Sequence, residues 1–172
     1  AATSKPTEYR FSSNNRGNEQ TGQWISALSG NTTNLFGLND TWDVSVSKSL
    51  GSNPFDFAYD GDSNRSASLG LSVPYGRWSL GYDYSFSDYE LTIPGAINLI
   101  DTDGSVRTHT LSADYLWDRN EDTKQILGVS LVRTENTNFI QDVRIDASSR
   151  TLTGLKLSYG RSNPLWSGFF DG

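Results

Sequence analysis

From Trp78 to Ser87, within the segment 78–88, the chain alternates large apolar with small polar side chains without interruption. Successive side chains of an extended strand point to opposite faces, so the alternation sorts them into an apolar and a polar face. The apolar face carries Trp78, Leu80, Tyr82, Tyr84 and Phe86. Soluble sheets alternate too, but their strands run for about five or six residues. A strand of about ten residues with aromatic side chains near its ends is typical of a transmembrane β-barrel.

The pattern recurs along the chain and predicts eight strands, at residues 7–14, 23–30, 41–50, 65–73, 78–88, 107–117, 124–134 and 151–159. The first hairpin is expected to turn at residues 15–19. The later connections alternate between short and long, and the long ones are residues 51–64, 92–105 and 135–150. Outer-membrane barrels have short periplasmic turns and longer extracellular loops. The sequence therefore predicts that the chain starts on the periplasmic side.

Composition fits this class although the chain is polar on average. Its 172 residues suit one domain, 1–172, and it has 35% hydrophobic residues and a mean hydropathy of −0.52. No run approaches the roughly 18 apolar residues that a membrane-spanning helix needs. A closed barrel satisfies every backbone polar group in lipid while it places apolar residues at only every second position. We therefore expect an all-β, antiparallel transmembrane β-barrel.

The two faces define two sets of candidate functional residues. Side chains of the polar face are predicted to line a pore, and they are Ser45, Ser47, Ser68, Gly70, Ser72, Ser79, Gly81, Asp83, Ser85, Ser87, Ser112, Asp114 and Lys156. Aromatic side chains near the turns are predicted to lie at the lipid–water interface, and they are Trp42, Tyr75, Trp78, Tyr115, Trp117, Tyr159 and Trp166. The charges of Asp114 and Lys156 either tune passage or are ordinary interior polarity. In the seventh strand, the same alternation would turn Ile126 and Val132 toward the pore, so the facing of that strand stays open.

Charge and residue content argue against nucleic-acid binding and catalysis. The net charge of −6 is opposite to what nucleic acid requires, and there is no cysteine. The one histidine, His109, shares the apolar face and is interpreted as interfacial, so a hydrolase hypothesis would depend on it alone. Residues 60–64 resemble the start of a calcium loop, but Arg65 and Leu71 replace its required glycine and glutamate. We expect no enzymatic activity, no cofactor and no metal site.

Several short motifs occur in an order that resembles one family. They are Asn14–Gly17, Thr21–Gly22, Asn34–Asp40, Val73–Leu80, Tyr115–Asn120, Thr123–Lys124, Asn138–Ile140 and Ser149–Thr153. Each motif is short and rich in turn residues, and together they span nearly all of the chain. The set resembles the barrel of the two-partner secretion transporters, which are the hemolysin secretion/activation proteins of Gram-negative bacteria.

This resemblance implies a fold, a location and a function. Members of the family have an N-terminal helix and two periplasmic POTRA domains before a sixteen-stranded barrel in the outer membrane. They move a large unfolded partner protein to the cell surface without ATP. The sequence has no POTRA domain, later strands or inward-folded loop with the Val-Arg-Gly-Tyr/Phe motif, so the resemblance covers the N-terminal half of the barrel. The implied partners are membrane lipid, lipopolysaccharide and a secreted polypeptide.

Barrel width separates this hypothesis from its alternative. An eight-stranded barrel is just wide enough for side chains to fill it. The predicted inward residues are mostly serine and glycine, which are too small to fill that space, so the sequence favours a wider barrel. The alternative is a self-contained eight-stranded outer-membrane barrel with a structural or surface-adhesion role, whose long loops bind ligands. A soluble β-sandwich would have shorter strands. The sequence leaves the oligomeric state open.

Overall fold

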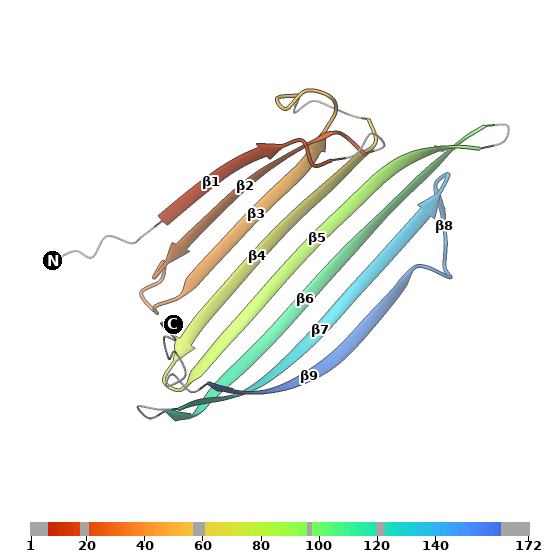
Figure 1. Cartoon of the computed structure of the whole chain (residues 1–172). Coiled ribbons are helices and arrows are strands. Elements are labelled where there is room, and N and C mark those ends of the chain that lie inside the picture. Colours follow the sequence, from red (N-terminus) through yellow and green to blue (C-terminus); the bar gives the residue numbers. More distant parts are fainter. Residues whose placement is uncertain (1–6, 18–20, 57–60, 96–97, 120–122, 163–172) are drawn as a thin grey trace, which may run out of the picture.

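The computed structural model describes residues 7–17, 21–56, 61–95, 98–119 and 123–162. These residues form one antiparallel sheet, in which strands β1 to β7 follow each other in sequence order and β8 and β9 both pair with β7. The strands are β1 (Thr7–Asn14), β2 (Trp24–Thr33), β3 (Thr41–Leu50), β4 (Ser63–Tyr75), β5 (Trp78–Pro94), β6 (Leu99–Arg119), β7 (Lys124–Ile140), β8 (Val143–Arg144) and β9 (Arg150–Ser162). Figure 1 shows them as one tilted sheet with β1 and β9 at its two margins. No helix that could span a membrane by its length and apolarity occurs among the described residues.

The structure corrects the predicted loop at residues 92–105. β5 continues to Pro94 and β6 begins at Leu99, so most of that segment is paired strand. The alternation of apolar and polar residues stops in this segment, as in Asp101-Thr102-Asp103, whereas the ladder of backbone hydrogen bonds continues. Backbone pairing satisfies N–H and C=O groups whatever the side chains are. The apolar pattern therefore ends before the strand does.

The predicted loop at residues 135–150 is wrong for the same reason. β7 continues to Ile140, and the chain turns back through Gln141 and Asp142, which both have positive φ, into the short β8. The second strand begins at Trp24, one residue after its predicted start, and runs to Thr33, three residues beyond its predicted end.

Both margins of the sheet are open. Within the described part of the chain, β1 pairs only with β2 and β9 pairs only with β7. An unpaired margin presents backbone N–H and C=O groups that lipid cannot satisfy. The sheet is thus an arc of a barrel rather than a closed eight-stranded barrel, as the small residues of its polar face predict.

The sheet is a single layer without a conventional core. Among the described residues, Leu50 is the one hydrophobic residue that is buried. On β9, Leu155 and Leu157 are 69% and 74% exposed. Contiguous apolar surface of this kind needs an apolar environment outside the protein, because water would penalise it.

The turn between β2 and β3 is built around the fully buried side chain of Asp40. Its carboxylate accepts hydrogen bonds from the backbone N–H groups of Leu35 (3.0 Å), Phe36 (3.1 Å) and Leu38 (3.3 Å). It also accepts one from the indole Nε1 of Trp42 (2.7 Å). A single side chain therefore satisfies the backbone of the turn and fixes the first aromatic residue of β3.

The surroundings of Asp40 favour its charged form. Burial by itself would raise the pKa of this carboxyl, but hydrogen bonds from the Trp42 indole and from the turn backbone, Phe36 first, outweigh burial and lower the pKa below its usual 3.8. The turn also needs left-handed backbone at Asn34, Gly37 and Asn39. Asparagine and glycine are the residues that adopt this conformation most readily.

The extensions of β5, β6 and β7 are tied together by side chains. Tyr89 lies over its register partner Gly104, where a Cβ would collide with the Tyr89 ring and with Asn138. The Tyr89 hydroxyl donates to Asn138 Oδ1 (3.2 Å), and the Asn138 N–H donates to Ser149 Oγ (3.0 Å). This network fastens the segment before β9 to the end of the sheet that lies opposite the short turns.

Candidate functional site: a polar wall and an apolar band

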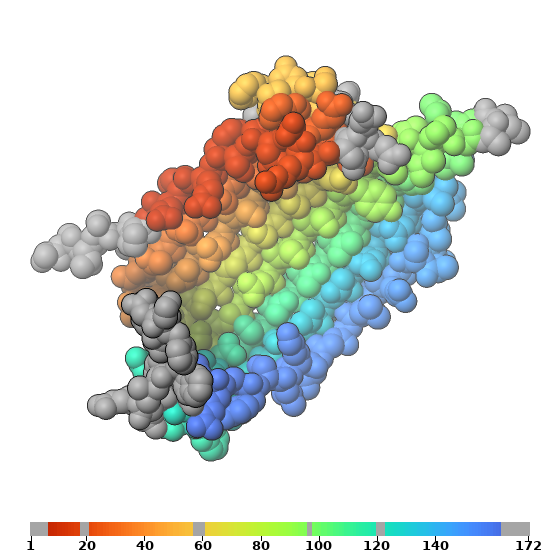
Figure 2. Space-filling model, viewed as in Figure 1, coloured from red at the N-terminus to blue at the C-terminus, as the bar shows by residue number. Residues whose placement is uncertain are grey.

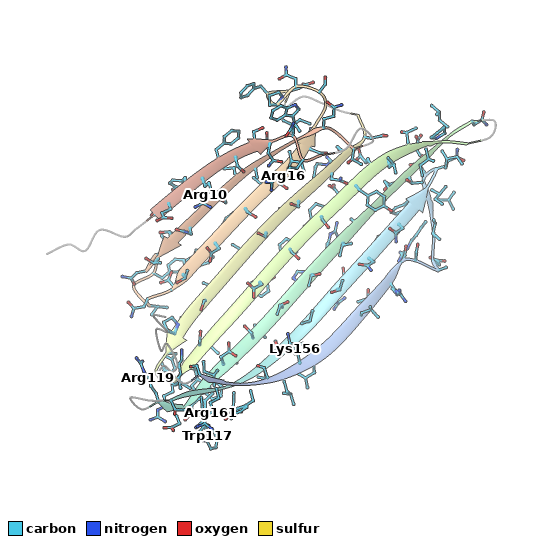
Figure 3. The ribbon with its side chains drawn as sticks, viewed as in Figure 1. Arg10, Arg16, Trp117, Arg119, Lys156 and Arg161 are labelled. Carbon is cyan, nitrogen blue, oxygen red and sulfur yellow. The ribbon has the colours of Figure 1, made fainter. Side chains whose placement is uncertain are left out.

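The register of the sheet gathers the polar side chains on one continuous surface, which we call the polar wall. One of its rows crosses from β2 to β7 and consists of Ser29, Ser45, Ser68, Ser85, Thr108 and Thr134. A second row crosses from β3 to β9 and consists of Thr41, Ser72, Gly81, Ser112, Ser130 and Lys156. Figure 2 shows a trough between the margins formed by β1 and β9. Figure 3 labels Lys156 on the β9 side and Arg10 on the β1 side.

Every predicted pore-lining residue belongs to the polar wall. Beyond those in the two rows, the register and the alternation within each strand place Ser47, Gly70, Ser79, Asp83, Ser87 and Asp114 on it. Ile126 pairs with Leu116 and Val132 with Thr110, so both lie on the wall face. The structure therefore decides the question that the sequence left open, namely which face of the sheet Ile126 and Val132 of the seventh strand belong to. Within the described residues, no ion pair joins Asp114 to Lys156.

Hydroxyl groups of the polar wall bond to each other across the strands. Ser45 lies 2.7 Å from Ser68 between the two Oγ atoms, and Ser47 lies 2.7 Å from Ser66 in the same way. Each hydroxyl is both donor and acceptor, so these pairs can exchange partners at little cost. The wall offers weak polar contacts with few apolar side chains among them.

Glycines on the polar wall make room for aspartates. Gly70 lies between Asp43 and Asp83 in the cross-strand row, and a Cβ there would be 3.3 Å from Asp83 Oδ1 and 3.6 Å from Asp43 Cβ. Gly128 likewise lies under the carboxylate of Asp114. The acidic side chains thus lie flat along the sheet instead of projecting from it.

The polar wall includes charged residues that the pore-lining prediction missed. Glu8 and Arg10 on β1, together with Asp43 on β3, line a cavity of about 530 Å³ at the β1 margin. The signal was available in the sequence, since Tyr9 and Phe11 define the opposite face of the same strand. The first strand contributes too few small residues to be identified as wall by composition.

The opposite surface, which we call the apolar band, begins at an aromatic row. Tyr75, Trp78, Tyr115, Leu127 and Tyr159 are register partners across β4, β5, β6, β7 and β9. The rings of Trp78 and Tyr115 are 4.8 Å apart between centroids. The Tyr159 hydroxyl donates to Gln125 Oε1 (3.0 Å). Such rings with one polar end suit the boundary between lipid and water.

Of the remaining predicted interface aromatics, Trp117 lies next to this row and Trp42 lies beside the turn between β2 and β3. Trp117 lies at a β-bulge between Leu116 and Asp118, with its ring edge-on to Tyr115 at 6.5 Å. Trp42 starts β3 beside the Asp40 turn, on the apolar face, with Leu71 as its register partner. Trp166 lies outside the described residues.

A border of charged residues ends the apolar band on the side away from the short turns. Arg65 is 2.7 Å from Glu90 and 3.3 Å from Asp88, and Arg133 is 2.7 Å from Glu135, measured between nitrogen and oxygen. The border is not level across the sheet. On β7 it begins at Arg133, whose register row reaches β4 at Leu69, two same-face positions nearer the aromatic row than Arg65. Tilted strands that cross a flat membrane surface produce such an oblique border.

The height of the apolar band is comparable to that of the lipid-facing belt of an outer-membrane barrel. On β5 it runs from Trp78 to Phe86, a distance of about 27 Å along the strand at about 3.4 Å per residue. A tilt of about 40° reduces this to about 21 Å across the membrane, slightly less than the lipid-facing belt of about 25 Å in outer-membrane barrels.

His109 lies on the apolar band between two tyrosines. Its Nδ1 is 2.9 Å from the Tyr82 hydroxyl, and its ring centroid is 4.9 Å from that of Tyr84. Within the described part of the chain, no three His, Cys, Asp or Glu side chains come together as a metal site.

The whole chain, residues 1–172, matches the family model of the haemolysin secretion/activation protein ShlB/FhaC/HecB. It is 34% identical to the outer membrane transporter CdiB of Dickeya dadantii over 90% of this chain and 26% of the relative. It is 28% identical to the hemolysin transporter protein ShlB of Serratia marcescens over 97% of this chain and 29% of the relative.

A solved structure shows the same fold. CdiB from Escherichia coli superimposes with a TM-score of 0.82 at 28% identity, over 96% of this chain and 30% of that one. The chain thus spans about a quarter to a third of the length of these relatives. Both its sequence motifs and its arc of sheet match the outer-membrane transporters. The chain therefore belongs to the haemolysin secretion/activation family, and its sheet is part of a β-barrel in the bacterial outer membrane.

Proposed function

We propose that the polar wall lines a conduit through which a large unfolded partner protein, of the hemolysin or adhesin type, reaches the cell surface without ATP. The relatives are named as transporters, one of them for hemolysin. In this proposal the chain acts as a conduit and catalyses no reaction. The short turns face the periplasm, and the extensions of β5, β6 and β7 face outward.

The continuous rows of hydroxyl and glycine residues carry this proposal. An extended polypeptide can exchange hydrogen bonds with paired serines such as Ser45 and Ser68, while few apolar side chains would trap it. Conduction requires binding that is weak enough for release at every step. The polar wall meets that requirement over most of its length.

The open margins of β1 and β9 indicate how the conduit is completed. Both margins require further strands before the sheet can exist in lipid. We propose that further strands, sixteen in total, close the barrel, because small residues on the inner face suit a wide hydrated pore.

Cysteine labelling tests the proposal, since the sequence has no cysteine of its own. Ser85→Cys puts a thiol on the polar wall, and Leu80→Cys puts one on the apolar band of the same strand. We expect a membrane-impermeant maleimide to label Ser85→Cys quickly and Leu80→Cys slowly. A maleimide with a long polyethylene glycol chain should then reduce surface export of the partner severalfold for Ser85→Cys only.

Two outcomes would contradict the proposal. Export that is unchanged by a bulky adduct at Ser85→Cys would show that the partner does not pass along the wall. A monomeric barrel that conducts no ions in planar bilayers, yet binds a surface ligand, would instead support the adhesion role.

A further inference from the structure

The apolar band carries a shallow groove beside its charged border. The groove has a volume of about 510 Å³, and it is lined by Leu69, Tyr82, Tyr84, Phe86, Arg107 and His109. These residues come from three adjacent strands, β4, β5 and β6. The groove therefore combines an apolar and aromatic floor with one cationic end.

Contacts between the side chains fix the floor of the groove. The Tyr82 hydroxyl is hydrogen-bonded to His109 (2.9 Å), and the Tyr84 ring packs against the His109 ring at 4.9 Å. The guanidinium of Arg107 lies over the Phe86 ring, 5.6 Å from its centroid. A site with little side-chain freedom loses little entropy when a ligand binds.

Arg107 differs from the other arginines of the border. Arg65 and Arg133 each have a carboxylate within 4.0 Å, but in the described part of the chain no carboxylate comes that close to Arg107. Its register partner Glu135 forms an ion pair with Arg133 instead. Arg107 is an exposed residue, so its guanidinium can bind an anion from outside the protein.

The cations of the border extend over several strands. Lys48, Arg65, Arg107 and Arg133 lie on β3, β4, β6 and β7, on the same face of the sheet. From β4 to β7 the sheet extends by about 14 Å, because neighbouring strands are about 4.8 Å apart. A headgroup with one phosphate can contact only part of this border, whereas a headgroup with two separated phosphates can contact more of it.

We propose that this groove and border bind the phosphorylated glycolipid of the outer leaflet, lipopolysaccharide, through its lipid A. An acyl chain lies against Leu69, Tyr84 and Phe86, and a phosphate binds to the Arg107 guanidinium. Arginine matches phosphate with two parallel hydrogen bonds, and its charge strengthens both. The inference rests on the outward orientation of the border proposed above, but not on secretion.

The test measures lipid binding to the assembled barrel in detergent, with its open margins paired by the strands that complete it. Native mass spectrometry would titrate bisphosphoryl lipid A, monophosphoryl lipid A and phosphatidylglycerol. The test variant is the double substitution Arg107→Gln and Arg133→Gln. The matched control is Arg150→Gln, because Arg150 lies at a similar level on the opposite face, in the row of Asn136.

We expect the double variant to bind bisphosphoryl lipid A at least about tenfold more weakly, since it loses charge-assisted hydrogen bonds. The control should bind as the wild type does. The wild type should prefer bisphosphoryl lipid A over both other lipids. Arg107→Lys keeps the charge and should lose less affinity than Arg107→Gln, which separates charge from an effect on folding.

Three results would overturn the proposal. One is unchanged affinity in the double variant, and another is an equal loss in Arg150→Gln. The third is phosphatidylglycerol binding as tightly as bisphosphoryl lipid A, which would indicate a general anionic interface. Export of the partner is measured in parallel, so that failure of lipid binding is distinguished from failure of the proposed conduit.

Discussion

The polar wall and the apolar band are built from the same strands, and their residues differ by a single position in the chain. On β4, Ser68 belongs to the wall and Leu69 to the band. The wall residue is hydrogen-bonded to its neighbour Ser45, whereas the band residue lines a groove that is open to the outside. The two faces are therefore stabilised differently, the wall by contacts inside the protein and the band by the surrounding lipid.

This difference between the two faces shows how strongly the pairing register between strands is constrained in a single-layer sheet. A shift of one residue between neighbouring strands would move serine rows into lipid and aromatic rows to the wall. Because the described residues form no second layer that could resist such a shift, we expect the membrane itself to select the register. Paired glycines and aspartates, such as Gly70 with Asp83, add a steric constraint on the wall side.

The largest expected effect comes from a charge placed on either face of β4. Leu71→Arg introduces a cation at the middle of the apolar band, which on β4 runs from Ala67 to Tyr75, and should destabilise the folded barrel by about 2–4 kcal/mol, the cost of arginine at the bilayer midplane. Ser68→Arg puts the same cation on the polar wall and should cost less than about 1 kcal/mol. Reversible urea unfolding in lipid vesicles measures both. Equal costs would show that the two faces do not differ in solvent.

The same alternation explains which parts of the fold can be predicted from the sequence. Strands β1 and β3 have the predicted bounds, because each ends where turn-forming residues follow, at Asn15–Gly17 and at Gly51–Pro54. The outer ends of β5, β6 and β7 were predicted as loops, because strand outside the membrane needs no apolar face. Backbone pairing and contacts such as Tyr89 with Gly104 maintain these ends, and neither leaves a periodic signal.

Part of the candidate site could likewise be predicted from the sequence, and part could not. Alternation identified every predicted pore-lining residue as a member of one face, but it could not identify the groove at Arg107. That groove depends on which residues become register partners across β4, β5 and β6, such as Tyr84 and His109. Register between strands is a tertiary property, which a single strand does not encode.

The second-largest expected effect comes from removing the carboxylate of Asp40 in the turn between β2 and β3. The lowered pKa of Asp40 means that its carboxylate stabilises the fold at pH values above its ordinary pKa of 3.8, and that this contribution is lost as pH falls through the lower, folded-state pKa. Asp40→Asn removes the titrating group and a good acceptor for Trp42 and the turn backbone. The variant should be less stable at neutral pH, and its unfolding midpoint should depend less on pH in the acid range.

Denaturant unfolding at several pH values, followed by Trp fluorescence, measures this effect. Trp42→Phe serves as the control, since it removes one donor to Asp40 and leaves the backbone donors of the turn in place. It should show an intermediate change. An unaltered pH dependence in Asp40→Asn would mean that the carboxylate does not stabilise the turn.

The smallest effect tests whether a side chain of the apolar face stabilises the sheet directly. Tyr9 on β1 covers its register partner Gly30 on β2, with Cδ1 3.1 Å from where a Cβ would lie. Tyr9→Ala should cost about 0.5–1 kcal/mol, as expected for a cross-strand aromatic contact. Arg10→Ala, on the wall face of the same strand, should stay within about 0.5 kcal/mol of the wild type.

Gly30→Ala should be tolerated better in the Tyr9→Ala background, because the ring no longer occupies the space above residue 30. A double-mutant cycle measures that coupling, and strictly additive costs would show that lipid alone, rather than the Tyr9 ring, protects the glycine.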